Sequence, residues 1–327
     1  MRGQRLFITG GTGFFGCWLL ESFAHINDVL ALEASATVIT RDPAAFAVRA
    51  PYLVDRGDLT FLRGDVRTFA FPPGEFAFVV HAAGSTAAKQ SELAPLEMFD
   101  AIVSGSRHVL DFATQAETRK LLFTSSGAVY GRQPPAFTHV PEDYAGAPDS
   151  LDPASAYGEG KRAAELLCAL YGCAHAFEVK IARCFAFVGP QLPLDANFAV
   201  GNFVRDALRE GPILVKGDGT PRRSYLYAAD LAIWLWTILF RGVSLRPYNV
   251  GSDQDLSIAE IASAVNHVVR SGGEVRIAHA PSPGAPVSRY IPSVQRAGQE
   301  LGLKQHILLP DAIRKMVAWH KATGEVV

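Results

Sequence analysis

The sequence predicts an α/β protein built on a doubly wound parallel sheet, with a smaller mixed α/β lobe after it. Two observations lead to this fold class. Apolar runs with the composition of β-strands alternate with helical stretches over the first half of the chain, and a glycine-rich turn directly follows the first run. Strands that alternate with helices are typical of βαβ units, whose strands lie parallel.

The expected strands are short runs rich in aromatic and β-branched residues. They are RLFIT (5–9), ATVIT (36–40), LTFLR (59–63), FAFVVHA (76–82), KLLFTSS (120–126) and EVKIARCF (178–185). Because helices cover a parallel sheet on both faces, such strands are apolar along their whole length. The helices expected between them span 14–23, 96–113 and 157–171.

After Phe185 the pattern changes to shorter, mixed segments. We expect helices near 201–209, 230–240, 258–269 and 310–320, and a strand near 213–215. We therefore predict two domains, 1–185 and 186–327, with an approximate boundary and with some later segments returning to the first domain. The second lobe is expected to close over the carboxyl ends of the strands, where ligands of open parallel sheets bind.

The composition excludes several classes of protein. The 327 residues are 49% hydrophobic and 19% charged with a formal net charge of -1, so no overall field attracts nucleic acid or an anionic membrane. The longest apolar run, LAIWLWTILF (231–240), is about half the roughly 20 residues that a membrane-spanning helix needs. We expect a buried helix there and no membrane partner.

The cysteines and the N-terminus point to a cytoplasmic location. The four cysteines show neither metal-ligand spacing nor the density of a disulfide scaffold, so we expect buried free thiols and no metal site. They are Cys17, Cys168, Cys173 and Cys184. The apolar stretch before the first glycines is too short for the core of a signal peptide.

The stretch FITGGTGFFG (7–16) carries a dinucleotide-binding pattern. It reads as Gly-x-Gly-x-x-Gly through Gly11, Gly13 and Gly16, and as Gly-x-x-Gly-x-x-Gly through Gly10, Gly13 and Gly16. Between a strand and a helix, such glycines allow a tight turn and let the backbone approach a pyrophosphate at the helix N-terminus. A glycine-rich turn without a ligand is the alternative.

The end of the second strand, VITRDP, bears on the choice of cofactor. NAD sites usually place an acid there for the ribose hydroxyls, whereas NADP sites often offer a basic residue. Here Thr40 and Arg41 take that place, and Arg41 is suited to a 2′-phosphate. A solvated surface arginine is the alternative, and Asp42 keeps NAD open. The expected cofactor is therefore NAD or NADP.

The stretch SAYGEGK (155–161) supplies a candidate acid/base pair. Tyr157 and Lys161 are four residues apart at the start of a helical stretch, so they share a face, and Ser155 is the expected N-cap. Tyrosine acts as a base near neutral pH when its pKa falls by about three units, roughly 4 kcal/mol. A nearby ammonium and a cationic nicotinamide ring favour that change. A chance Tyr–Lys pair is the alternative.

A row of hydroxyls strengthens this interpretation. LLFTSSGAVYG ends an expected strand in Thr124, Ser125 and Ser126 at the carboxyl edge of the sheet. Ser126 is placed to hydrogen-bond the substrate oxygen that Tyr157 deprotonates. A serine that merely forms a turn is the alternative.

These residues resemble those of the extended short-chain dehydrogenase/reductases, specifically the nucleotide-sugar epimerases, dehydratases and ketoreductases. The likeness runs nearly end to end and implies a Rossmann-type first domain. Thr9 and the glycines after it fit the family's Thr-Gly-x-x-Gly-x-x-Gly, Asp65 fits an aspartate that binds adenine, and HAAG (81–84) fits a strand end that lines the cofactor. Of Phe14 and Phe15, one is also expected in the core. The implied cofactor contacts are Gly10, Gly13, Phe14, Phe15, Gly16, Arg41, Asp65, Val66, Ala82, Ala83, Gly84, Tyr157 and Lys161.

The resemblance also implies catalytic and substrate residues. The catalytic positions of the family are filled by Ser126, Tyr157 and Lys161. In the second lobe, Arg223 and Arg289 match arginines that bind a substrate diphosphate, an anion suited to the forked guanidinium. Asn202 lies near the family's substrate-binding helix, and Ser126 is also expected to contact the substrate.

Departures from the family narrow the activity. In its 4,6-dehydratases, the two positions after the catalytic hydroxyl hold acids that move the C5 proton and assist loss of water, but here they are Gly127 and Ala128. Ala186 and Ile102 stand where relatives often carry Asn, and Ser293 replaces a frequent Asp. Dehydration would therefore lack its acid/base pair, and we expect a sugar pocket that differs from well-known members.

The resemblance implies reversible hydride transfer at C4 of a nucleoside-diphosphate sugar, by an epimerase or a 4-ketoreductase. A 4,6-dehydratase or decarboxylase is the alternative among enzymes, and a non-catalytic NAD(P)-binding sensor is the alternative of another class. In this interpretation 1–185 carries the cofactor and the catalytic residues and 186–327 binds the nucleotide sugar. Family members commonly dimerise through a four-helix bundle, which would use 96–113 and 157–171 in a homodimer.

Overall fold

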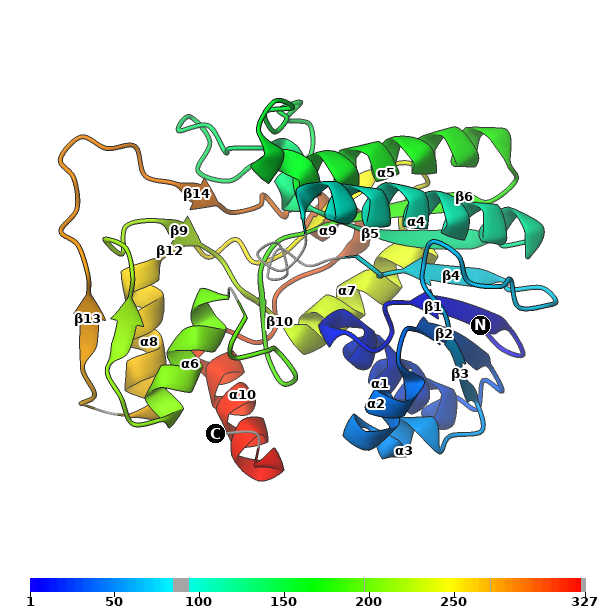
Figure 1. The fold of residues 1–327 in the computed structure, drawn as a ribbon, viewed down its shortest axis with the longest axis horizontal. Coiled ribbons are helices and arrows are strands. Elements are labelled where there is room, and N and C mark those ends of the chain that lie inside the picture. Colours follow the sequence, from blue (N-terminus) through cyan, green and yellow to red (C-terminus); the bar gives the residue numbers. More distant parts are fainter. Residues whose placement is uncertain (85–93, 197, 271, 325–327) are drawn as a thin grey trace.

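A parallel sheet of seven strands forms the centre of the protein (Figure 1). The computed structural model describes residues 1–84, 94–196, 198–270 and 272–324, and the strand order is β11-β6-β5-β4-β1-β2-β3. Every neighbouring pair is parallel. The strands are β1 (Arg5–Thr9), β2 (Ser35–Thr40), β3 (Leu59–Arg63), β4 (Phe78–His81), β5 (Lys120–Ser126), β6 (Glu178–Cys184) and β11 (Pro247–Val250). The predicted fold class, an α/β doubly wound parallel sheet, is confirmed.

Helices cover both faces of this sheet. The long helices are α1 (Phe14–Val29), α4 (Pro95–Gln115), α5 (Ala156–Ala174), α6 (Ala199–Leu208), α7 (Ala228–Arg241), α8 (Ile258–Val269) and α10 (Leu309–Thr323). The short ones are α2 (Pro43–Arg49), α3 (Pro51–Val54) and α9 (Gln295–Leu301), with 3-10 turns η2 (Gly127–Tyr130) and η3 (Pro153–Ser155). The helices that were predicted from periodicity are therefore present, most of them longer by a few residues.

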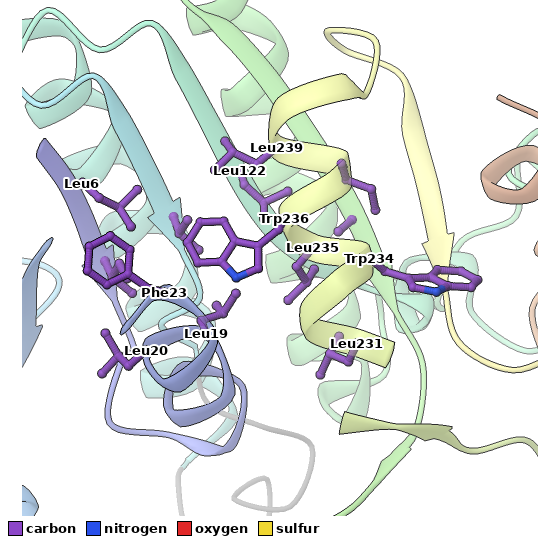
Figure 2. Close-up of a cluster of buried hydrophobic side chains, with 14 of the residues drawn as sticks. Leu6, Leu19, Leu20, Phe23, Leu122, Leu231, Trp234, Leu235, Trp236 and Leu239 are labelled. Atoms are coloured by element: carbon purple, nitrogen blue, oxygen red, sulfur yellow. The ribbon is translucent and has the colours of Figure 1, made fainter. Parts of the chain in front are cut away.

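The alternation of side chains along β1 shows how the sheet forms a hydrophobic core on each of its two faces. Leu6 and Ile8 enter a core with α1 and α7, whereas Phe7 enters a second core with α4 and α5. Figure 2 shows Trp236 of α7 projecting toward α1, where its indole N–H donates to Ser22 Oγ at 2.8 Å. Because both faces are buried, the carboxyl edge of the sheet is left to bind ligands.

The edge strand β11 comes from the second half of the chain. It pairs with β6 over the four residues Pro247–Val250, so segments after residue 185 return to the main sheet, as α7 does. The sequence did not predict this strand, because a four-residue run that includes a proline carries little signal. Proline is tolerated at the first residue of an edge strand, since its missing N–H breaks no ladder bond there.

The remaining segments form small sheets and helices apart from the main sheet. β9 (Arg222–Arg223) lies between β12 (Leu256–Ser257) and β14 (Arg289–Tyr290), and β8 (Ile213–Val215) pairs with β13 (Val275–Ile277). β10 (Leu226–Tyr227) pairs with β7 (Phe187–Val188). A third core joins β7, β8, β10, β12 and β13 to α6, α8 and α10.

Two further findings concern membrane-spanning helices and the cysteines. Of the helices in the described ranges, none combines the length and the hydropathy that crossing a bilayer takes. All four cysteines are free, and Cys17, Cys168 and Cys184 are buried as expected. Cys173 is exposed, because it lies in the last turn of α5.

Candidate active site

Two glycines of the first turn are required by close backbone packing. Gly10 has a φ of +71°, and a Cβ there would lie 2.6 Å from the backbone of Ala82. A Cβ at Gly16 would lie 2.3 Å from the carbonyl oxygen of Gly10. The turn is thus folded tightly against the residue that follows β4.

Gly13 is different, because it faces outward. Among the described residues, the nearest atom that a Cβ at Gly13 would meet is the carbonyl oxygen of Gly10, at 3.4 Å. Gly13 is also the N-cap of α1, so it has no side chain to cap the free N–H groups of the first turn. These donors and the helix dipole suit the pyrophosphate of a dinucleotide, so the residues present fit an NAD-type cofactor.

Arg49, which the sequence analysis did not single out, stabilises the glycine turn by a hydrogen bond to its backbone. Arg49 of α2 donates to the carbonyl of Thr12 and to Sγ of Cys17, the latter at 3.3 Å. Thr12 Oγ1 also lies 3.0 Å from Thr40 Oγ1 at the end of β2. No local pattern reveals such a contact, since it joins segments far apart in the chain.

The predicted adenosine contacts lie where β2 and β3 end. Arg41 is exposed, and Asp42 Oδ1 accepts the N–H of Ala45 at 3.0 Å, so this carboxylate caps α2. Asp65 forms an ion pair with Arg67 at 2.9 Å, which lowers the pKa of the carboxyl, and the charge of Arg41 adds to that effect. Arg41 therefore remains available to a ligand, whereas Asp42 and Asp65 already have partners.

The strand end HAAG lies between the glycine turn and the Tyr–Lys helix. The N–H of Ala83 donates to Thr9 Oγ1 at 3.1 Å, and a Cβ at Gly84 would lie 3.1 Å from Nζ of Lys161. Ala82 is the residue against which Gly10 packs. Val66 packs against Gly105 of α4. Of the predicted cofactor contacts, Gly10, Ala82, Gly84 and Lys161 are thus brought together.

The buried side chain of His81 links β1 to α4. Its Nδ1 lies 2.7 Å from Thr9 Oγ1 and its Nε2 lies 3.0 Å from Ser106 Oγ. Burial, with a smaller effect of the charge on Lys161, lowers the pKa of His81 to about 3. The imidazole is therefore neutral and serves as a hydrogen-bonded link.

Lys161 is a buried cation at the floor of the site. Its Nζ donates to the carbonyl oxygen of Thr124 at 2.8 Å and lies 4.8 Å from the ring centre of Phe123. Burial lowers the pKa of Lys161 to about 8. Ser155 occupies the N-cap position of this helix but makes no capping hydrogen bond, because η3 runs directly into α5 and leaves Ser155 in a helical conformation.

Ser126 and Tyr157 are brought into contact. Ser126 Oγ accepts the N–H of Ala128 at 3.1 Å, and Ser126 lies close enough to Tyr157 to favour the ionised form of its phenol. Burial raises the pKa of Tyr157 to about 12, and the nearby Ser126 hydroxyl opposes only part of this effect. Lys161 does not lower the pKa of Tyr157 in the described part of the chain. Its ammonium instead donates to the carbonyl oxygen of Thr124.

Phe185 fills the space beside Gly127. A Cβ at Gly127 would lie 2.6 Å from the Phe185 ring, so a larger residue fits there only if this ring moves.

A second tyrosine, which the sequence did not single out, lies at the catalytic hydroxyls. Tyr290 OH is 3.4 Å from Ser126 Oγ, and its ring centre is 4.7 Å from that of Phe185. The Arg223 guanidinium lies 6.0 Å from the Tyr290 ring centre. Only the pairing of two-residue strands brings these residues together, so no sequence period could predict it.

The two predicted phosphate-binding arginines belong to different faces of one small sheet. Register pairs Tyr290 with Arg223 and Arg289 with Arg222, so Arg289 shares a face with Arg222. Arg289 Nε lies 3.5 Å from Asp255, which also binds Arg222. Arg223 is therefore near the catalytic hydroxyls, whereas Arg289 lines a cavity of about 570 Å³ on the other face.

Asn202 supports the loop before α6. Its Nδ2 donates to the carbonyl oxygens of Leu194 and Ala196 at 2.7 and 2.8 Å. Within the residues that the structure describes, no three His, Cys, Asp or Glu side chains are grouped as metal ligands.

The chain is similar in sequence to proteins of known type. The sequence model of the "NAD dependent epimerase/dehydratase family" matches residues 6–251. The chain is 28% identical over 315 residues to UDP-glucuronic acid decarboxylase 6 of Arabidopsis thaliana, covering 96% of this chain and 88% of the relative.

Solved structures show the same fold. UDP-glucose 4-epimerase of Thermotoga maritima with UDP-glucose has a TM-score of 0.82 at 19% identity, covering 98% of this chain and 99% of that one. UDP-glucuronic acid 4-epimerase of Bacillus cereus with UDP-glucuronic acid and NAD has a TM-score of 0.82 at 20% identity, covering 98% and 100%.

Proposed function

Because the chain belongs to the NAD-dependent epimerase/dehydratase family, we propose that it transfers hydride reversibly at C4 of a nucleoside-diphosphate sugar, as an epimerase or a 4-ketoreductase. The observation that carries this proposal is the proximity of Ser126 to Tyr157 at the end of β5, where Gly127 and Ala128 follow Ser126 instead of acids. Such a site offers a base and a hydrogen-bond donor for one sugar oxygen.

Three residues of the chain have separate roles in this reaction. Tyr157 takes the proton of the C4 hydroxyl, Ser126 donates a hydrogen bond to the same oxygen, and Lys161 supplies a buried positive charge. NAD, when bound, supplies the hydride acceptor and donor. Because burial alone raises the pKa of Tyr157, proton removal depends on the positive charge that the oxidised cofactor adds.

We assign the binding roles from the same geometry. Residues up to about 185 hold the cofactor and the catalytic groups, and the later lobe holds the nucleotide sugar. Arg223 binds the diphosphate near the catalytic hydroxyls. Arg289 binds the diphosphate only if it leaves its ion pair with Asp255. Asn202 shapes the loop at the substrate. We place the enzyme in the cytoplasm, because its free thiols suit a reducing compartment.

A nucleotide-sugar decarboxylase is the second candidate. The similarity to UDP-glucuronic acid decarboxylases favours it. Oxidation of a uronic acid at C4 gives a β-keto acid, which can lose carbon dioxide without a further acid in the site. This route therefore shares the first hydride step with the epimerase and differs only in the fate of the 4-keto sugar.

Incubation of the purified protein with UDP-, GDP-, CDP- and dTDP-sugars tests the proposal, after mass spectrometry of the cofactor it carries. Redistribution between two C4 epimers with bound NAD and no net cofactor change indicates an epimerase. Consumption of NADPH with a 4-keto sugar indicates a ketoreductase in which Arg41 binds the 2′-phosphate. Release of carbon dioxide from UDP-glucuronic acid indicates the decarboxylase, and no change in any sugar overturns the proposal.

We propose a homodimer formed through α4 and α5. Leu166 and Leu170 of α5 are 61% and 57% exposed and lie one turn apart, which leaves an apolar stripe beside α4. We expect the double variant Leu166→Glu with Leu170→Glu to be monomeric in light scattering, because two buried carboxylates oppose association.

Ile233→Glu is the matched control, since Ile233 is a similarly exposed apolar residue, at 51%, on α7. It should leave the dimer intact. A wild-type protein that is monomeric at all concentrations, or a double variant that still dimerises, would rule out this interface.

A further inference from the structure

Tyr290 is held rigidly at the catalytic hydroxyls by its backbone. β14 pairs with β9 on one side. On the other side, the N–H of Ile291 donates to Gln133 Oε1 at 3.0 Å, and Val140 N donates to the carbonyl oxygen of Ile291 at 2.9 Å. The segment is thus fixed from two directions, and the position of the Tyr290 side chain follows from it.

The ring of Tyr290 is held as well. It packs against Phe185 at a tilt of 37°, with the Arg223 guanidinium on another side. Its hydroxyl then lies 3.4 Å from Ser126 Oγ. Hydrogen bonds of catalytic groups are often this long before a ligand binds.

The hydrogen-bonding capacity of Ser126 decides the direction of this bond. A serine hydroxyl has one proton and two lone pairs. The N–H of Ala128 takes one lone pair, at 3.1 Å. Once Tyr157 is ionised, its oxygen can only accept, so the proton of Ser126 is directed to Tyr157 or to the substrate oxygen. Tyr290 then donates to the second lone pair of Ser126.

We propose that Tyr290 is a positioning residue, which orders the chain Tyr290 to Ser126 to Tyr157 and thereby stabilises the phenolate of Tyr157 during oxidation of the sugar. This inference rests on the proposed function for its kinetic consequence, but the ordering of the three hydroxyls is a property of the chain itself. No proton leaves Tyr290, which only donates a hydrogen bond.

The sign of the effect is set by the charge that is stabilised. A hydrogen bond donated toward a phenolate favours the charged form and lowers its pKa. Loss of the Tyr290 hydroxyl removes the donor that polarises Ser126 and makes Ser126 a weaker donor, so the pKa of Tyr157 rises and less phenolate is present at neutral pH.

Other groups around Tyr157 stay the same in this comparison. Cys184 of β6 raises the pKa of Tyr157, and Lys161 lies one turn away on α5. Arg223 of β9 faces Tyr290. Among the described residues, α4, η2 and η3 bring no charged group that changes the pKa of Tyr157. The shift can therefore be attributed to the hydroxyl of Tyr290.

The test is the pH dependence of sugar oxidation by Tyr290→Phe, with UDP-glucose, UDP-galactose or UDP-glucuronic acid as the substrate that the wild type turns over. We expect the rising limb to move up by about one pH unit, so that kcat falls about ten-fold at neutral pH and recovers at alkaline pH. A purely structural loss would lower kcat equally at every pH, and an unmoved limb overturns the proposal.

A double-mutant cycle adds a second criterion. In a Ser126→Ala background, Tyr290→Phe should have no further effect, because its action passes through Ser126. Tyr144→Phe is the matched control, since Tyr144 is a half-buried tyrosine that packs against Tyr130 and Phe137 instead. Its pH profile should match the wild type.

A direct titration separates this inference from the proposed function. NMR of ¹³Cζ-labelled tyrosine, with the Tyr157 signal assigned through Tyr157→Phe and with NAD⁺ added, reports the pKa of Tyr157 without turnover. A wild type that turns over no sugar refutes the proposed function, yet a higher pKa of Tyr157 in Tyr290→Phe still supports the ordering. Equal pKa values in both proteins refute the inference even if turnover is found.

Discussion

Tyr157→Phe is expected to lower sugar turnover by about 10²–10⁴-fold, the usual contribution of a positioned acid/base group. The variant removes one buried hydroxyl, whose partner is Ser126, and leaves the ring in its place. Folding and NAD binding should therefore persist. Single-turnover formation of NADH, together with calorimetric titration of NAD, measures the two properties separately.

Tyr171→Phe is the control for this prediction. Tyr171 lies on the same helix, and its hydroxyl bonds to Asp111 of α4 away from the cofactor turn. Its activity should stay within a factor of two or so of the wild type, as for most surface substitutions. Full activity of Tyr157→Phe would favour the non-catalytic NAD-binding sensor instead.

Local sequence signals predicted the cofactor half of the molecule well. β1, β3 and β5 begin and end at the predicted residues, because continuous apolar runs with turns at both ends have few other solutions in a parallel sheet. The glycine turn was predictable for a similar reason, since its neighbours are the adjacent strand and helix.

The substrate side was predicted less completely, because its geometry depends on contacts between distant segments. β9 and β14 are two residues long, and only their register shows that Arg223 and Arg289 belong to opposite faces. The contact of Tyr290 with Ser126 joins positions 164 residues apart. No periodicity in the sequence carries this information.

The predicted lowering of the pKa of Tyr157 involves two charges, the Lys161 ammonium and a cationic nicotinamide ring, and the chain without cofactor shows only the position of the first. A shared helix face does not fix where the Lys161 side chain ends. Nζ of Lys161 bonds to the carbonyl of Thr124, and burial of the phenol then dominates. Sequence spacing gives proximity, whereas the direction of a pKa change requires the partners of each atom.

Gly16→Ala is expected to destabilise the protein by about 3 kcal/mol, near the upper end for overpacked sites. The added Cβ would lie 2.3 Å from the carbonyl oxygen of Gly10 and equally close to the backbone of Gly11. Because these are backbone atoms, the clash is relieved only by separating α1 from β1. Urea unfolding followed by circular dichroism measures the loss.

Gly13→Ala separates this structural requirement from the ligand's requirement. The backbone at Gly13, with φ of -87° and ψ of -178°, is open to alanine, and the new Cβ meets Gly10 O at an ordinary 3.4 Å. Stability should therefore stay within about 1 kcal/mol of the wild type. The methyl group would instead occupy the space that the turn leaves for a pyrophosphate, so affinity for NAD should fall at least ten-fold in calorimetric titration. If Gly13→Ala binds NAD as the wild type does, the outward face of this turn is not the pyrophosphate site, and the cofactor contacts must be sought elsewhere along the sheet edge.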